Sequence, residues 1–420
     1  MLRAKTAAGH GMNGQAGTER QVRRRRVFYI PGYDPIHPRR YRELYRKEGQ
    51  AQAAISGYAL ELTPKATPGP YGWHVAAEIE GARVESDVEV LVWSDIVRGS
   101  MANTLAATYG QMLRTAWAYI GSGALRRLMR LRKGPVIAAL YPVGALVLLA
   151  LVALVLTVGG GWGGWGLFGP PGGIFGLLAG GAAGWGLMEW VRARDGRTFI
   201  FYLMHDYAYS AQFGGANPPE LEARMAEFGE VIAAALAGET DEVLVVGHSS
   251  GAHLAVSVLA DLIRAGHVPA GGPALGFLSL GQVVPMVSFL PRAERLRGDL
   301  AFLSGRDELA WVDVTAPGDG CAFALCDPVA VSGVAPAGKR WPLVLSAAFT
   351  QTLSPERWRA LRWRFFRLHF QYLCAFDRPG DYDYFRITAG PRTLAARFEG
   401  RAPSQSRIEA AVSKYTSVAA

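Results

Sequence analysis

The chain has 420 residues and a net charge of +9, and 50% of its residues are hydrophobic while only 19% are charged. Soluble domains carry roughly 25% charged residues, so this shortage indicates contact with lipid. The three cysteines have neither C-x-x-C nor zinc-ligand spacing, which argues against a disulfide framework and a structural metal. No nucleic-acid-binding motif accompanies the positive charge, so the charge indicates an anionic membrane surface or a simple excess of arginine.

The first part of the chain is predicted to contain a tail and the first elements of a folded domain. Residues 1–22 are polar and glycine-rich, lack the apolar core of a secretory signal, and are expected to form a disordered tail. Arg23–Arg26 then precede an apolar strand, Val27–Ile30, and we interpret this run as a lipid-headgroup contact or a solvated strand edge. Further elements are expected in this first domain part, residues 23–125: a β-hairpin near His74–Ile79 and Val88–Trp93, and a helix around Met101–Ile120.

Residues 126–197 are predicted to be a transmembrane hairpin inserted into the domain. From Gly134 to Met188 the sequence contains no Asp, Glu, Lys or Arg. Two spans are expected, Pro135–Val158 and about Gly173–Val191, because each is long enough to cross a hydrocarbon core of about 30 Å. A buried soluble hairpin or a re-entrant segment is the alternative.

Glycines and basic residues give the hairpin its expected packing and orientation. Gly176, Gly180 and Gly184 repeat every four residues, which leaves one helix face flat enough for close approach of a second helix. The glycine-rich stretch at 159–172 is expected to form the turn. Basic residues flank both spans and place both flanks, the domain and both termini in the cytoplasm, as for a bacterial inner-membrane protein: Arg126, Arg127, Arg130, Arg132, Lys133, Arg192, Arg194 and Arg197.

After the hairpin, residues 198–400 alternate short apolar strands with amphipathic helices, and 401–420 are expected to be a C-terminal tail. The predicted elements are a helix at Pro219–Ala237, a strand at Glu242–Val246, a helix at Ala252–Ala265, and strands at Ala274–Leu280, Trp311–Thr315 and Pro342–Ala348. This pattern indicates an α/β fold with a mostly parallel sheet covered by helices on both faces. Because the hairpin falls between sheet elements, deleting Gly134–Trp190 is expected to leave an active soluble domain.

A nucleophile motif follows one of these strands. Gly247-His248-Ser249-Ser250-Gly251 matches G-x-S-x-G, comes directly after the apolar run Val243–Val246, and opens a helix. Such a strand-to-helix turn holds the central serine in a strained conformation, and its flanking glycines relieve the crowding. We therefore predict Ser249 as a nucleophile, with a tight turn of no chemical role as the alternative.

In this motif and its setting the chain resembles the α/β-hydrolase superfamily, particularly its lipases and esterases. The resemblance covers residues 22–125 and 198–400. It implies an oxyanion hole formed by the N–H of Ser250 and by an N–H of Gly32 or Tyr33, in the loop after Val27–Ile30. The family often has His-Gly in this loop, whereas this chain has Pro31-Gly32, and a plain Pro-Gly turn is the alternative.

The resemblance also implies an acid and a histidine that follow the serine in that order. His369 is predicted as the base, because His253 lies in the helix after the serine and His267 lies in a short link. A packed histidine on an apolar helix face is the alternative for His369. Asp319, in the loop Pro317-Gly318-Asp319-Gly320, is predicted as the acid, with Asp313 and Asp327 as rivals.

These residues predict a membrane-anchored serine hydrolase that cleaves a carboxylic ester, or a thioester, of a lipophilic substrate through an acyl-enzyme on Ser249. No metal or organic cofactor is implied. An acyltransferase with the same triad, or a membrane scaffold without activity, would fit the sequence as well. His205 and Asp206, just after the hairpin, are interpreted as part of a cap or lid with no chemical role.

Overall fold

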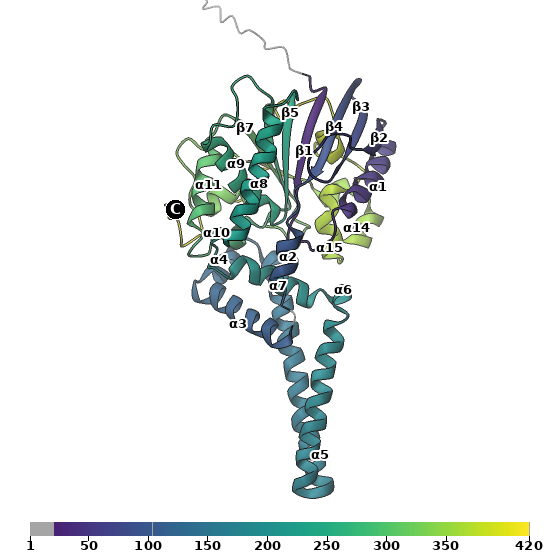
Figure 1. Cartoon of the computed structure of the whole chain (residues 1–420), viewed down its shortest axis with the longest axis vertical. Helices are drawn as coiled ribbons and strands as arrows, with labels where there is room; N and C mark the ends of the chain where they lie inside the picture. Colours follow the sequence, from purple (N-terminus) through teal and green to yellow (C-terminus); the bar gives the residue numbers. More distant parts are fainter. Residues whose placement is uncertain (1–20, 103, 420) are drawn as a thin grey trace, which may run out of the picture.

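The computed structural model describes residues 21–102 and 104–419, which form a mixed α/β fold around one eight-stranded sheet (Figure 1). The strand order is β2-β3-β4-β1-β5-β6-β7-β8. The β2–β3 and β3–β4 pairs are antiparallel and all other pairs are parallel. The strands are β1 (Arg24–Ile30), β2 (Ala59–Pro64), β3 (Gly72–Ile79), β4 (Ala82–Val90), β5 (Glu242–His248), β6 (Ala274–Leu280), β7 (Leu309–Thr315) and β8 (Leu343–Ser346).

Strand β5 shows why the central strands are apolar along their whole length. All seven of its residues are buried. Val243 and Val245 pack in the cluster on one face of the sheet, and Leu244 and Val246 pack in the cluster on the other. Because successive side chains of a strand point to opposite faces, a sheet covered on both sides needs apolar residues at every position.

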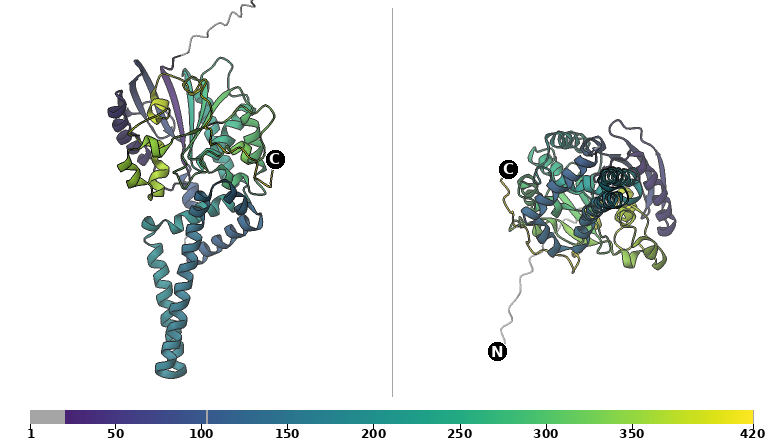
Figure 2. Two further views of the ribbon diagram at one scale, coloured as in Figure 1. Left: turned by 180° about the vertical axis from the view of Figure 1, so that it is seen from behind. Right: turned by 90° about the horizontal axis from the view of Figure 1, so that it is seen from below.

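Helices cover both faces of the sheet (Figure 2). One face carries α8 (Pro219–Leu236), α9 (Gly251–Arg264) and α11 (Glu294–Ser304). The other face is covered by α1 (Arg39–Ser56) and by short elements from the C-terminal part of the chain: α13 (Phe349–Thr352), α14 (Pro355–Leu361), α15 (Phe365–His369), η1 (Phe370–Leu373), α16 (Tyr384–Ala389) and α17 (Leu394–Arg397).

A third group of helices lies at the carboxyl ends of the parallel strands, where the long element α5 leaves the domain (Figure 1). Side chains from six helices of this group form two further apolar clusters around the base of α5. The site described below therefore opens toward this end of the molecule. The helices are α2 (Ser94–Ser100), α3 (Leu105–Gly121), α4 (Ala124–Leu131), α5 (Lys133–Arg192), α6 (Asp195–Thr198), α7 (Ile200–Ala211), α10 (Val284–Ser288) and α12 (Pro328–Val331).

Element α5 is helical throughout except at Gly169, where φ is 66° and ψ is −158°. At this residue the chain reverses, and the two arms lie side by side (Figures 1 and 2). A Cβ at Gly184 would lie 2.8 Å from Ala153 Cα, and a Cβ at Gly180 would lie 2.8 Å from Thr157 Cα, so the glycine stripe faces the first arm. The predicted turn at 159–172 is too long, because Gly160 and Gly164 continue the helix and pack against the backbone of the second arm.

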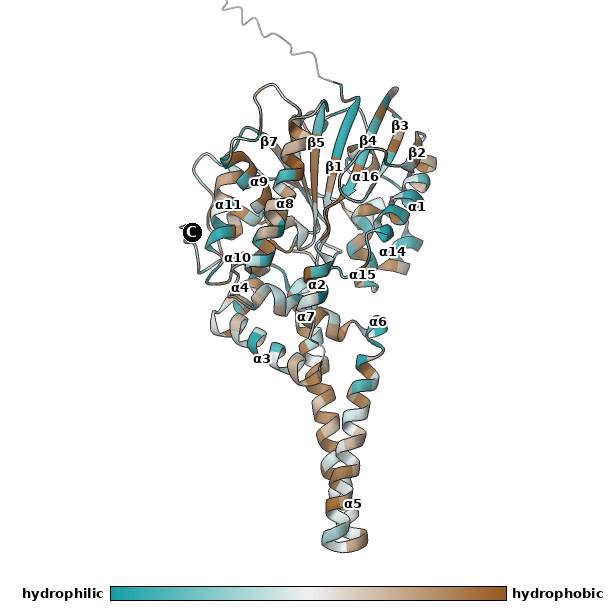
Figure 3. Cartoon of the chain, in the orientation of Figure 1, coloured by the Kyte–Doolittle hydropathy of each residue, from teal (hydrophilic) through white to brown (hydrophobic). Residues whose placement is uncertain are grey.

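By length and composition, one helix of the described chain is apolar enough to cross a membrane, and it is α5. Figure 3 shows hydrophobic residues along both of its arms, whereas the surface of the domain is mixed. Large apolar side chains are exposed along the arms, among them Leu154, Trp162 and Phe175. Such a surface is unfavourable in water and matches contact with lipid.

Most of the arginine run belongs to β1 itself, which begins at Arg24, and β1 is not an edge strand of the sheet. Arg23 and Arg24 are exposed at the start of this strand, whereas Arg25 is buried. Strand β1 pairs with β4 and β5 in the middle of the sheet, and Arg25 is buried there, with its Nε 2.5 Å from a Glu242 carboxylate oxygen. This end of β1 is also opposite to the end from which α5 projects, so contact with lipid headgroups is excluded for Arg25 (Figure 1). Burial of a charge needs such a partner, which the local sequence does not reveal.

Several predicted boundaries are also corrected. The hairpin strand expected at Val88–Trp93 is β4, which ends at Val90, and the helix expected at Met101–Ile120 is α3, which begins at Leu105 and ends at Gly121. The expected tail at 1–22 lies outside the described residues except for its last two, of which Val22 is buried and donates its N–H to Pro391. The segment after 400 packs along the domain, where the Ile408 N–H donates to Leu325.

Candidate active site

Ser249 lies in the turn between β5 and α9, at the carboxyl end of the sheet. Its φ is 56°, a left-handed value that costs a non-glycine residue roughly 1–2 kcal/mol. The surrounding backbone holds this conformation, because the Ser249 N–H donates to the Leu280 carbonyl at 2.9 Å. The hydroxyl is consequently presented above the strand, at the N-terminal end of a buried helix.

The glycines of the motif allow three segments to meet at this turn. A Cβ at Gly247 would lie 2.7 Å from Ala252 Cα, and a Cβ at Gly251 would lie 2.6 Å from the Pro31 carbonyl oxygen. A Cβ at Gly32 would lie 3.0 Å from Ser249 Cβ. The spacing of the glycines is therefore explained by close packing of strand, helix and the loop after β1.

His369 and Asp319 form a hydrogen-bonded pair beside Ser249. The Nδ1 atom of His369, at the end of α15, lies 2.7 Å from a carboxylate oxygen of Asp319, in the loop after β7. The same oxygen accepts from the Tyr372 hydroxyl at 3.0 Å, and the other carboxylate oxygen accepts from the Cys321 N–H at 2.9 Å. Burial tends to raise the pKa of Asp319, but the nearby His369 charge and these hydrogen bonds lower it, so the carboxylate stays ionised.

His248, one of the two variable residues of the motif, fixes the backbone of His369. Its Nε2 lies 3.0 Å from the His369 carbonyl oxygen, and its ring packs 4.8 Å from the His369 ring. Burial, aided by the charge of His369, lowers the pKa of His248 to about 3, so the ring is neutral and donates through Nε2. No local sequence pattern predicts this role, because the contact joins residues 121 positions apart.

The two rival acids occupy other places. Asp313 lies within β7, where its carboxylate accepts from the Ser279 hydroxyl at 2.6 Å, and burial raises its pKa to about 8. Asp327 caps α12 and pairs with Lys339 at 2.6 Å. Of the three acids, the one within hydrogen-bond distance of His369 is Asp319.

The loop after β1 lies against Ser249 and is held from several sides. The Pro31 carbonyl accepts from the Trp93 indole at 2.9 Å, the Tyr33 carbonyl accepts from the Tyr202 hydroxyl, and the Asp34 carboxylate accepts from the Tyr41 hydroxyl at 2.7 Å. Within the described residues, no protein acceptor takes the backbone N–H of Gly32, Tyr33 or Ser250. Free N–H groups on two sides of a serine are what an oxyanion hole requires.

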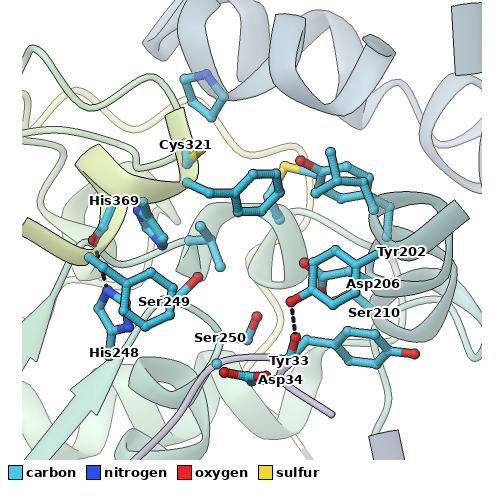
Figure 4. Close-up of a pocket in the computed structure, with 18 of the residues that line it drawn as sticks. Tyr33, Asp34, Tyr202, Asp206, Ser210, His248, Ser249, Ser250, Cys321 and His369 are labelled. Carbon is cyan, nitrogen blue, oxygen red and sulfur yellow. Dashed lines mark hydrogen bonds between the residues drawn. The ribbon is translucent and has the colours of Figure 1, made fainter. Parts of the chain in front are cut away.

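Ser249, Ser250 and His369 line one pocket together with Gly32 and Tyr33 of the loop after β1 (Figure 4). Ser249 and His369 lie on one side of it, and Asp206 lies across from them. Asp206 is half-buried, and burial raises its pKa to about 7 although the His369 charge opposes the rise. His205 and Asp206 both lie on α7, and of the two only Asp206 lines this pocket, while His205 is hydrogen-bonded to Gln111.

Asp319, Cys321 and His369 also have ligand atoms within 4.8 Å of one another, a spacing that a metal ion could use. Two features oppose this use. The His369 Nδ1 atom and an Asp319 oxygen are already hydrogen-bonded to each other, and burial raises the pKa of the Cys321 thiol well above its usual range. A thiol that stays protonated is a poor metal ligand.

Comparison with protein-family models, with curated proteins and with solved structures finds no match to this chain. The resemblance to α/β-hydrolases therefore depends on the motif and on the site alone. The arrangement itself offers a serine hydroxyl, a histidine oriented by a carboxylate, and free backbone donors in one pocket.

Proposed function

We propose that the protein is a serine hydrolase that cleaves a lipophilic carboxylic ester through an acyl-enzyme on Ser249. The observation that supports this most is the 2.7 Å contact between Asp319 and the Nδ1 atom of His369, a histidine that lines the same pocket as a serine of positive φ. A packed core histidine would need neither the ionised carboxylate nor the strained serine. Nucleophile, base and orienting acid together form the unit that activates a hydroxyl at neutral pH.

The proposed reaction has two steps. His369 Nε2 takes the proton of Ser249 Oγ as the Oγ–C bond forms, and His369 then gives this proton to the leaving alcohol as the ester C–O bond breaks. Water next attacks the acyl group, gives its proton to His369, and releases the acid while Ser249 regains a proton. Asp319 holds the imidazole in the required tautomer, and the N–H groups of Ser250 and of Gly32 or Tyr33 stabilise the oxyanion.

The proposal includes a two-span membrane anchor. At about 1.5 Å per residue, the shorter arm of α5, residues 170–192, is roughly 34 Å long and exceeds a hydrocarbon core of about 30 Å. The basic residues flanking α5 favour a cytoplasmic domain with both termini on the same side. Reporters fused to the two termini should both report the cytoplasm, and a tag inserted at Pro170 should be accessible from outside. Termini on opposite sides would contradict two spans.

A fluorophosphonate probe tests the chemistry directly, because it bonds only to an activated serine. The wild-type protein should be labelled at Ser249, and Ser249→Ala should not be labelled while it keeps the melting temperature of the wild type. Ser257, which is buried on the same helix, supplies the matched control, since Ser257→Ala should leave labelling intact. Absence of labelling in the folded wild type would instead support a scaffold without activity.

The role of His369 needs a second measurement, because its loss could lower either chemistry or stability. His369→Ala should reduce kcat by several orders of magnitude, and the double change with Ser249→Ala should cost little more than either change alone. Asp319→Asn should reduce kcat as well, since it disturbs the tautomer. If His369→Ala instead lost about 1–3 kcal/mol of unfolding free energy but kept its turnover per folded molecule, His369 would have a packing role and no catalytic one.

A further inference from the structure

A second cavity adjoins the Ser249 pocket on the side of α5. Helices α3, α4, α5 and α7 enclose it, and none of the described residues that line it is charged. Its walls include Ala116, Leu128, Val136 and Ala139. The hydroxyl of Tyr119, one of its few polar groups, is already used in a 3.0 Å hydrogen bond to the Met286 carbonyl. The cavity therefore offers apolar surface and almost no polar partner.

The two cavities share walls. Tyr207 of α7 and Met286 of α10 line both the Ser249 pocket and the apolar cavity. The adjacent residues Pro135 and Val136, at the start of α5, line one cavity each. Tyr207 and Met286 thus form a wall common to both cavities, and methionine is a flexible side chain that adapts to a neighbour.

The outer edge of the apolar cavity lies where α5 leaves the domain. Ile120 at the end of α3 is 63% exposed and Leu140 on α5 is 43% exposed, and both line the cavity. Trp117, one turn before on α3, is 79% exposed. Exposed apolar residues beside an element long enough to cross a membrane mark an opening toward lipid.

We propose that this cavity binds the acyl chain of a membrane lipid and delivers its ester carbonyl to Ser249 past Tyr207 and Met286. The inference rests on the proposed hydrolase function and specifies its substrate as a long-chain acyl ester that enters sideways from the bilayer. Each methylene buried in an apolar site contributes about a fourfold gain in kcat/KM. The wild type should therefore prefer long-chain esters, with kcat/KM rising about fourfold per methylene until the cavity is filled.

Ala116→Phe tests the cavity, because it fills the space without lining the Ser249 pocket. Ala106→Phe, on the exposed side of the same helix, is the matched control. With p-nitrophenyl esters from butyrate to palmitate, Ala116→Phe should leave butyrate turnover unchanged and reduce palmitate kcat/KM by about tenfold or more. Ala106→Phe should change neither. If kcat/KM of Ala116→Phe depended on acyl-chain length as in the wild type, this inference would be wrong. Turnover of butyrate in the same experiment would still support the proposed hydrolase function.

The position of the acyl chain can also be determined by crosslinking in the wild-type protein, so the result does not depend on a variant that folds. An alkyl fluorophosphonate with a diazirine at the end of a long chain should bond to Ser249 and, after illumination, crosslink to residues of the apolar cavity such as Ile120 or Leu140. Crosslinks near Asp34 or Tyr41, in the Ser249 pocket outside this cavity, would place the chain elsewhere and refute the inference. Failure to label Ser249 at all would instead refute the proposed function.

Discussion

Gly251→Ala should damage catalysis strongly while the protein still folds. The added Cβ would lie 2.6 Å from the Pro31 carbonyl oxygen and still closer to the Ile30 carbonyl oxygen, whereas real Cβ contacts essentially never fall below 3.0 Å. Helix α9 and the loop after β1 must therefore separate by about half an ångström to one ångström. These two segments carry the two sides of the proposed oxyanion hole. A misplacement of about 1 Å costs roughly 100-fold in rate, and overpacking costs about 1–3 kcal/mol of stability.

The assay is kcat on a short-chain ester, normalised to fluorophosphonate-labelled protein, together with thermal unfolding in detergent. Gly229→Ala is the control, since a Cβ at Gly229, within α8, would meet nothing within 4 Å. This change should leave kcat unaltered and raise stability by roughly 0.5–1 kcal/mol, because alanine favours the helix. If folded Gly251→Ala kept kcat within a few-fold of the wild type, the oxyanion hole would not lie between α9 and this loop.

Two further predictions concern charge and helix packing. The pKa of Asp206 is about 7 in the folded protein and lower in the unfolded chain, so the free energy of unfolding should fall as the pH rises from roughly 4 to 7. Asp206→Asn should remove this loss, which is worth at most about 4 kcal/mol above pH 7 and nothing below pH 4. Thermal melts of both proteins at several pH values measure it. Equal melting temperatures of the two proteins at pH 8 would contradict it. Gly180→Leu should separate the arms of α5 and lower stability by roughly 1–3 kcal/mol, whereas Gly186→Leu, which meets no neighbour, should not.

The parts of the fold that sequence predicts are those with a strong local pattern. Strand β6 occupies the expected residues Ala274–Leu280, because a short apolar run needs burial on both faces. Helix α1 and strand β2 were missed. The buried face of α1 consists of two tyrosines, a glycine and a glutamine, and edge strand β2 has no buried residue and only Leu60 and Leu62 in alternation, so the apolar pattern of both elements is weak.

The candidate site also contains some residues that the local sequence predicts and others that depend on tertiary contacts. The setting of Ser249 is local, and a motif of five residues predicts it. The order of acid and base along the chain pointed to Asp319 and His369, but only the folded chain brings them within 2.7 Å of each other. The place of Asp206 in the pocket wall could not be predicted, because it depends on which side of α7 faces the pocket, and the rise of its pKa depends on burial. Side chains that act through tertiary contacts leave no pattern in a single sequence.

The expected result of deleting the hairpin must also change. Excision of Gly134–Trp190 would remove Pro135, which lines the Ser249 pocket, and Leu146, which is buried at the base of α5. This deletion should therefore abolish activity on short-chain esters rather than preserve it.

A shorter excision, of residues 151–186, should keep the base of α5 and the activity. Ala153 packs against Gly184, so the cut ends at residues 150 and 187 lie on neighbouring arms, and a linker of about four glycine or serine residues can join them. The product lacks a segment long enough to cross a bilayer and should leave the membrane fraction, while it turns over butyrate esters within a few-fold of the wild type. Turnover, fluorophosphonate labelling and melting curves of both deletion variants show which part of α5 the activity needs. If the shorter deletion were folded and labelled yet inactive, the outer arms of α5 would have to act in catalysis, and their assignment as an anchor would be wrong.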